Sequence, residues 1–382
     1  MGCLLRLALD NSLPLLAGTS AALLWANLDP GVYQSVSEPL HFVVNEIGMV
    51  FFFALAAKEV CEALLPAGPL ASLSRAALPL MATVGGMVGP ASLYLLGAWF
   101  FGHNELARGW AIPCATDIAF SYLTTRAIFG AKHPAVIFLL LLALADDALG
   151  LVILASFYPT SSINLFWLAL LAGGGVGLGL LLKKTGWQSF WIYLFGPGVL
   201  TWIGFYLGGI HPALALVPVV FCMPHESRDL GIFDDREVGQ SDTLSRLERW
   251  WKDPVQVILG LFGFANAGVE LTATGPATWL VLGGLLLGKP LGILLATRLG
   301  ALFGLRLPDG IGWKDLSVVS AAASIGFTVA LFVSTVAFAF GTALDHAKMG
   351  ALLSLVAAPL SIILAKILGV KKRRLHRLFQ FS

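Results

Sequence analysis

Two adjacent aspartates lie in the middle of a long apolar segment of this 382-residue chain. Asp146 and Asp147 occur in LLLLALADDALGLVILASF, near the centre of the run 134–157. A charge in hydrocarbon costs about 2.5–3.5 kcal/mol on insertion scales, so such residues are rare unless they are paired or line a polar cavity. Adjacent helical positions point about 100° apart, so the two carboxylates face different neighbours. One buried carboxylate could serve a structural partner, whereas two in succession indicate a functional site.

The chemistry open to such a pair is competition between a metal cation and protons. A metal cation needs ionised oxygen ligands, and a proton neutralises the same oxygens, so both cannot occupy the site together. Neighbouring ionisable groups titrate as a coupled set. The pair therefore suits the exchange of a cation for protons.

Lys289 is a further ionisable residue inside an apolar segment, in LLLGKPLGILL. A buried lysine must find a carboxylate or lose its proton. A static structural salt bridge would satisfy it. The functional alternative is a charge that titrates against an aspartate during a cycle.

Asp117 lies in AIPCATDIAFSY, beside a predicted break in a helix. Pro113 removes a backbone donor and disturbs the preceding turn, and Thr116 adds a hydroxyl oxygen. A second irregular stretch, Ala323–Thr328, contains Gly326. Interrupted segments in two halves of a chain are typical of the binding site of a transporter.

The composition predicts that these residues are positioned by membrane-spanning helices. Hydrophobic residues make up 57% of the chain, charged residues 12%, and the mean hydropathy is +0.83. Soluble domains carry about 25% charged residues, and apolar runs of this length are typical of membrane spans. The net charge of +2 gives no indication of a nucleic-acid partner, and the scattered cysteines indicate neither disulfides nor metal ligands. We expect an all-α protein with about twelve spans, at 13–28, 42–65, 76–100, 110–129, 134–157, 164–182, 188–206, 210–224, 254–271, 276–297, 315–339 and 347–368.

The distribution of Lys and Arg over this topology predicts its orientation. Of the 24 such residues, Lys58 and Lys289 fall inside segments, twenty fall on one side of the membrane, and only Arg108 and Lys348 fall on the other. The positive-inside rule then places both termini in the cytoplasm. We expect a single transmembrane domain over 1–382, with a cytoplasmic loop at about 225–253 that holds an amphipathic helix near Thr243–Trp251. The basic tail at about 369–382 is expected to contact anionic lipid.

Several motifs, in this order along the chain, resemble those of NhaA-type sodium/proton antiporters. The similarity runs from about Asn45 to the twelfth segment, and the Asp-Asp and Gly-Lys-Pro-Leu-Gly motifs are the most specific to the family. It rests on GGMVGPASLYL, IPCATDIAF, LALADDALGLVILASFY, LFGFANAGVEL, LLGKPLGI and SIGFTVALFVSTVAF.

The resemblance implies roles for the residues singled out above. Asp147 is similar to the principal ion-binding carboxylate, with Asp146 beside it and Lys289 as the partner of Asp146. Thr116 and Asp117 match the point near the membrane middle where two interrupted helices of an inverted-topology repeat cross. A cytoplasmic pH-sensing cluster in the family corresponds to the set Glu248, Arg249 and Lys252.

By resemblance the chain is a transporter of the bacterial inner membrane, not an enzyme, without a cofactor. It would exchange Na+, and Li+ as well, for H+ electrogenically, in a lipid bilayer and as a homodimer. Three features depart from the family pattern. Glu46 replaces an aspartate, the segment 29–41 is too short for a dimerising β-hairpin, and the loop 225–253 is more acidic, without histidines near Arg249–Lys252.

Two other classes of protein compete with this interpretation. An intramembrane aspartyl protease would bring two aspartates from different helices, such as Asp117 and Asp147, to one peptide bond. The Gly-x-Gly-Asp context of those enzymes is missing here. A passive cation channel would also place carboxylates in the membrane, but two corresponding helix breaks favour alternating access.

Overall fold

The computed structural model describes residues 12–65, 68, 73–224 and 242–370. Over these residues every regular element is helical, which confirms the predicted all-α class. Most of the polar loop 225–253 and of the basic tail 369–382 lies outside the described residues. The amphipathic helix expected near Thr243–Trp251 is present, as the first part of a longer helix, α13 (Thr243–Asn266).

Seven helices in the described part of the chain are long and apolar enough to cross a membrane. The bent pair α16 (Trp313–Ala322) and α17 (Phe327–Ala337), with 50° between its members, would make an eighth. The protein is therefore a multi-pass membrane protein. The seven spans are Pro30–Leu64, Ala76–Phe100, Pro134–Phe157, Leu165–Lys184, Phe190–Gly208, Pro276–Leu302 and Thr342–Ile367.

The chain divides into two compact units. Unit 1 comprises Met1–Ser74, Asp147–Thr278 and Leu331–Met349, and unit 2 comprises Arg75–Asp146, Trp279–Ala330 and Gly350–Ser382.

Unit 1 is built around a long helix that begins earlier than the sequence predicted. Helix α3 (Pro30–Phe42) passes through a π-helical turn, Val43–Gly48, directly into α4 (Met49–Leu64). The predicted start at residue 42 was wrong because Asp29 caps the helix and Pro30 suits a first turn, where its missing N–H is not needed. The segment 29–41 is thus helical and forms no β-hairpin.

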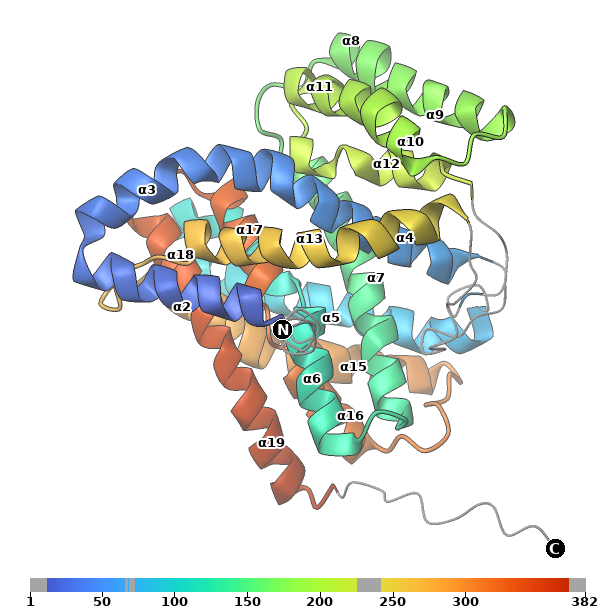
Figure 1. Cartoon of the computed structure of the whole chain (residues 1–382). Coiled ribbons are helices and arrows are strands. Elements are labelled where there is room, and N and C mark those ends of the chain that lie inside the picture. Colours follow the sequence, from blue (N-terminus) through green and yellow to red (C-terminus); the bar gives the residue numbers. More distant parts are fainter. Residues whose placement is uncertain (1–11, 66–67, 69–72, 225–241, 371–382) are drawn as a thin grey trace, which may run out of the picture. The chain divides into compact units, whose positions relative to one another are not determined.

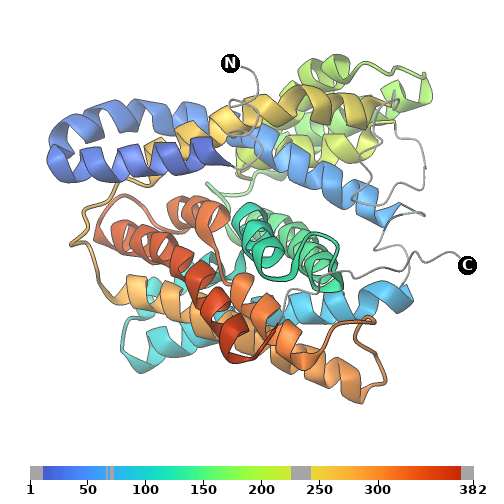
Figure 2. The ribbon, with the colours of Figure 1, turned by 60° about the horizontal axis from the view of Figure 1, so that its bottom comes forward.

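Helix α13 packs along α2 (Leu13–Leu28) in this unit, as Figures 1 and 2 show. The contact is close because two glycines meet: a Cβ on Gly18 would lie 1.9 Å from the carbonyl oxygen of Gly260. The remaining helices of unit 1 are α8 (Leu165–Trp167), α9 (Gly174–Lys184), α10 (Phe190–Tyr193), α11 (Val199–Gly208) and α12 (Leu216–Cys222).

Unit 2 contains the same order of elements twice: a long helix, an interrupted helix and a further long helix. The first series is α5 (Leu73–Phe100), a 3₁₀ segment (Asn104–Cys114) with α6 (Ile118–Phe129), and α7 (Pro134–Phe157), which leaves the unit after Asp146. The second is α14 (Pro276–Gly283) with α15 (Lys289–Leu302), then α16 with α17, then α18 (Thr342–Leu353) with α19 (Ala357–Ile367). Of this second series, unit 2 holds Trp279–Ala330 and the residues from Gly350.

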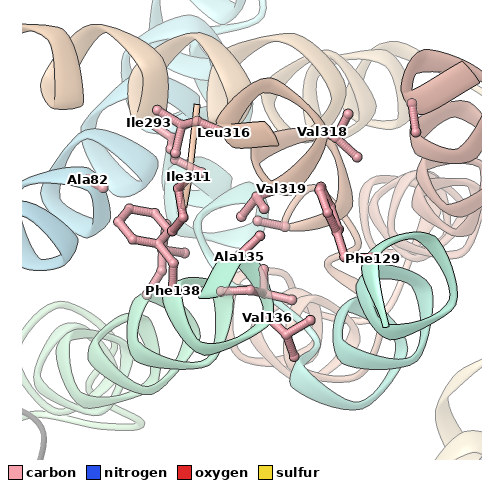
Figure 3. Close-up of a cluster of buried hydrophobic side chains, with 14 residues drawn as sticks. Ala82, Phe129, Ala135, Val136, Phe138, Ile293, Ile311, Leu316, Val318 and Val319 are labelled. Carbon is pink, nitrogen blue, oxygen red and sulfur yellow. The ribbon is translucent and has the colours of Figure 1, made fainter. Parts of the chain in front are cut away.

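An apolar cluster holds the helices of unit 2 together (Figure 3). Phe129, Phe138 and Leu316 are among its fully buried members, with residues of α5, α15 and α19 around them. Helices α5 and α15 cross in close contact, since a Cβ on Gly292 would lie 2.0 Å from the carbonyl oxygen of Gly85. This crossing sets the position of the helix that begins at Lys289.

Candidate functional site

A buried ion pair occupies unit 2. The Lys289 ammonium lies 2.8 Å from Asp146 Oδ2, and the side chains are 0% and 1% exposed. The lysine also donates a hydrogen bond to the carbonyl of Cys114. Asp146 Oδ1 is buried and receives no hydrogen bond from any described residue. The pair therefore neutralises both charges and leaves one carboxylate oxygen unused by the protein.

The local sequence explains where Lys289 emerges. A π-helical turn, Gly284–Gly288, precedes it, and Pro290 stands at the start of α15, where proline is tolerated. A Cβ on Gly288 would lie 2.7 Å from Pro90 Cα, so only glycine permits this approach to α5. Because residue 288 is a glycine, α15 can begin close to α5 and place the side chain of Lys289 in the buried site.

Asp147 follows Asp146 on α7 and differs from it in environment. Asp146 is 3% exposed, whereas Asp147 is half-buried. The difference agrees with the expectation that adjacent helical positions face different neighbours.

The two helix breaks of unit 2 contact each other through their backbones. The first spans Ala115–Asp117 and the second Ala323–Gly326. The Asp117 N–H donates to the Ile325 carbonyl at 2.7 Å, and the Thr116 hydroxyl donates to the Ala323 carbonyl at 3.2 Å. Irregular backbone at membrane depth requires such internal partners. Thr116 also lies beside the Asp146 carboxylate, so the breaks adjoin the ion pair.

The Asp117 carboxylate caps two helices at once. Its Oδ1 accepts from the Phe120 N–H at 3.3 Å, at the start of α6. Its Oδ2 accepts from the Thr328 N–H at 3.1 Å, at the start of α17, and also from the Thr328 hydroxyl. Helix N-termini carry partial positive charge, so one carboxylate offsets two of them.

Pro113 and Gly326 lie at the edges of these breaks. Pro113 is buried in the 3₁₀ segment, and the extended residues begin two positions later. A Cβ on Gly326 would lie 2.6 Å from Leu285 Cδ2 and 3.1 Å from the Ala115 carbonyl oxygen. The Gly326 N–H donates to Ser354 Oγ at 3.2 Å. Neither Thr328 nor Ser354 was selected from the sequence as a site residue, because hydroxyls within apolar helices usually bond to their own backbone.

The residues matched to a pH-sensing cluster lie near the start of α13, in unit 1. Glu248 forms an ion pair with Lys58 of α4, and Lys58 lies 2.7 Å from Glu62 Oε2 on its own helix. Lys58 is only 5% exposed, whereas Arg249 and Lys252 are exposed. The structure thus joins Glu248 to Lys58 and Glu62 of α4.

Comparison with known proteins decides the family. The sequence profile of the family described as Na+/H+ antiporter 1 matches residues 3–365. The chain belongs to this antiporter family. It is 46% identical to the Na(+)/H(+) antiporter NhaA of Jannaschia sp., over 95% of this chain and 97% of that protein. It is 48% identical to the NhaA of Desulfitobacterium hafniense, over 95% of each chain.

A solved structure shows that the fold is shared with a more distant antiporter. The sodium proton antiporter MjNhaP1 from Methanocaldococcus jannaschii superposes with a TM-score of 0.58, over 94% of this chain and 92% of that chain. The sequence identity is only 16%, so this similarity concerns the fold alone. The resemblance to NhaA-type antiporters predicted from the motifs is confirmed.

Proposed function

We propose that this chain exchanges Na+ for H+ across the bacterial inner membrane, with ion and protons competing for Asp146 and Asp147. Membership in the antiporter family supports the exchange itself. The observation that carries the proposed mechanism is the buried ion pair between Asp146 and Lys289, since Asp146 directly precedes Asp147. Li+ is a further substrate in this proposal.

In this mechanism Asp147 is the principal ligand of the cation and Asp146 is its second carboxylate. While Lys289 is paired with Asp146, the lysine ammonium balances the negative charge of the carboxylate that a sodium ion would otherwise balance. Arrival of Na+ frees Lys289 to release its proton, and departure of Na+ lets protons return. If more than one proton is exchanged for each Na+, every cycle moves net charge, and the membrane potential can drive transport.

The helix breaks support the site in two ways. The Asp117 carboxylate holds the starts of α6 and α17 in place by accepting hydrogen bonds from both. The Thr116 hydroxyl, which lies beside the Asp146 carboxylate, can contribute an oxygen ligand. Half-helices that end at membrane depth are typical of transporters that alternate access around a fixed site.

The full topology of this proposal has about twelve spans and both termini in the cytoplasm. The repeated order of helices in unit 2 supports an inverted-topology repeat. Both units would serve one transporter domain, 1–382, surrounded by lipid and paired with a second copy as a homodimer. The cluster of Glu248, Arg249 and Lys252, extended by Lys58 and Glu62, would adjust the pH at which exchange begins.

The proposal is tested by sodium-dependent pH changes in everted membrane vesicles over a range of pH. Asp147→Asn should abolish exchange, with Asp309→Asn as the matched control, because Asp309 is exposed in the loop before α16. In the unchanged protein the apparent KM for Na+ should rise as the pH is lowered, since protons then compete better for the carboxylates. Full exchange by Asp147→Asn would refute the mechanism.

The same vesicles discriminate against the two other classes. A passive channel would conduct Na+ without counter-transport of protons. A protease is disfavoured by geometry, because Asp117, one of the two aspartates that such an enzyme would use, is bound to the starts of two helices.

A further inference from the structure

A second group of buried polar side chains lies in unit 1, around the π-helical turn Val43–Gly48. Such turns occur frequently at functional sites. Asn45 and Asn266 exchange two side-chain hydrogen bonds, of 3.1 and 2.9 Å. The Trp202 indole N–H donates to the Glu46 carbonyl at 2.9 Å. The turn is thereby tied to α13 on one side and to α11 on the other.

The Glu46 side chain ends against His211. Glu46 is 22% exposed and His211 6% exposed, and Glu46 Oε2 lies 3.5 Å from His211 Nδ1. This carboxylate oxygen is buried, and no N–H or O–H of the described residues donates a hydrogen bond to it. The imidazole ring packs edge-on against Phe332, with 5.0 Å between the ring centroids.

His211 Nδ1 already accepts a hydrogen bond. The Ala213 N–H donates to it at 3.3 Å, which caps the 3₁₀ turn Pro212–Leu214. A ring nitrogen that accepts carries a lone pair and no proton. Two lone-pair atoms, Nδ1 and Oε2, therefore face each other in a buried place. A gap of 3.5 Å is too short for a bridging water, which would need about 2.8 Å to each atom at an open angle.

We propose that Glu46 and His211 share one proton that is loaded and released during exchange, at a site separate from the aspartate pair. With the proton on Glu46, its O–H and the Ala213 N–H share the single lone pair of His211 Nδ1, so the helix cap is kept in weakened form. With the proton on Nδ1, the imidazolium donates to the Glu46 carboxylate and the cap is lost. Proton position is thus coupled to the start of the helical segment that continues into α12.

Charged groups of neighbouring elements also act on this site. On the same long helix, His41 lies near enough to Lys348 and Glu38 for their charges to act on it. Lys348 of α18 is 5% exposed, with Asp345 as its acidic neighbour.

Infrared difference spectroscopy of the purified full-length chain tests whether the proton exists. A pH titration should show the carbonyl stretch of a protonated carboxylic acid, lost in Glu46→Gln and kept in Glu38→Gln. Glu38 is the matched control, since it lies in the same long helix but is exposed and bonded only to Gln34 in the described contacts. His211→Asn, which can still cap Ala213, should shift the pH at which the band disappears. A band retained in Glu46→Gln overturns the proposal.

Exchange measured in liposomes tests whether this proton takes part in transport, and this half rests on the proposed function. Glu46→Gln should slow exchange by at least about tenfold while leaving the KM for Na+ near that of the unchanged protein. Loss of the band together with unaltered exchange would show a static proton and refute the inference. If the unchanged chain itself fails to exchange, the proposed function fails, while the infrared result still decides whether Glu46 and His211 share a proton.

Discussion

Asp117 and Thr328 are separated by 211 positions in the sequence and are joined by two hydrogen bonds, from the Thr328 N–H and from its hydroxyl. Because Asp117 also caps α6, this contact ties together the starts of two half-helices. The negative charge therefore acts on both helix ends, and its removal should be felt in stability as well as in transport.

Asp117→Asn should lower the free energy of unfolding by about 1–2 kcal/mol, since it weakens two caps and removes the charge that offsets two helix N-termini. Thr328→Val should cost less, because the backbone N–H of residue 328 remains. Thr328→Ser, which keeps the hydroxyl, serves as the control. Thermal unfolding of the purified variants in detergent gives the ranking. Equal stability of Asp117→Asn and the unchanged protein would contradict the double-cap interpretation.

Lys289→Met should destabilise the protein by about 3–5 kcal/mol, because it leaves the buried Asp146 carboxylate without its counter-charge. The double variant Lys289→Met with Asp146→Asn should recover much of this loss, as both charges are then gone. Exchange should not recover with it, if the pair carries protons. Unfolding midpoints and vesicle exchange are measured on the unchanged protein, the single variants Lys289→Met and Asp146→Asn, and the double variant. A static salt bridge would instead leave the double variant active.

Some of this site could be predicted from sequence, and the reason is electrostatic. Asp146 and Lys289 stand out because lipid penalises any charge without a partner, whatever the fold. The helix breaks were indicated by Pro113 and by the small residues around Gly326. The family and the all-helical class followed from the motifs and from the apolar runs.

The partners across the breaks could not be predicted. Thr328 donates to the capping carboxylate of Asp117, and the carbonyl of Cys114 accepts a hydrogen bond from Lys289, because the helices are interrupted beside these residues. Such contacts depend on backbone positions that no periodicity in the sequence reveals. The π-helical turn at Val43–Gly48 and the helix start at Pro30 were missed for a similar reason, since an apolar run shows depth in the membrane but not helical register.

The crossing of α5 and α15 gives a prediction about packing alone. Gly292→Ala should destabilise the protein strongly, since its Cβ would lie 2.0 Å from the Gly85 carbonyl oxygen and a backbone atom cannot move away cheaply. Overpacking of this kind typically costs about 1–3 kcal/mol or more. Gly283→Ala, in α14, is the matched control because nothing lies within 4 Å of the added carbon. Unfolding temperatures decide, and similar values for the two variants would show that the helices are not in contact as described.

The last prediction concerns Glu248 and the pH dependence of exchange. Glu248→Gln removes a negative charge beside Lys58 and Glu62, so deprotonation of the remaining cluster becomes easier and the onset of exchange should move to lower pH. The maximal rate and the KM for Na+ should stay close to those of the unchanged protein, because no residue of this cluster is placed at the aspartate pair. Glu270→Gln is the control, since Glu270 is exposed beyond the end of α13. Exchange is recorded in everted vesicles at closely spaced pH values. An unchanged onset in Glu248→Gln would limit the contact between α4 and α13 to a structural role.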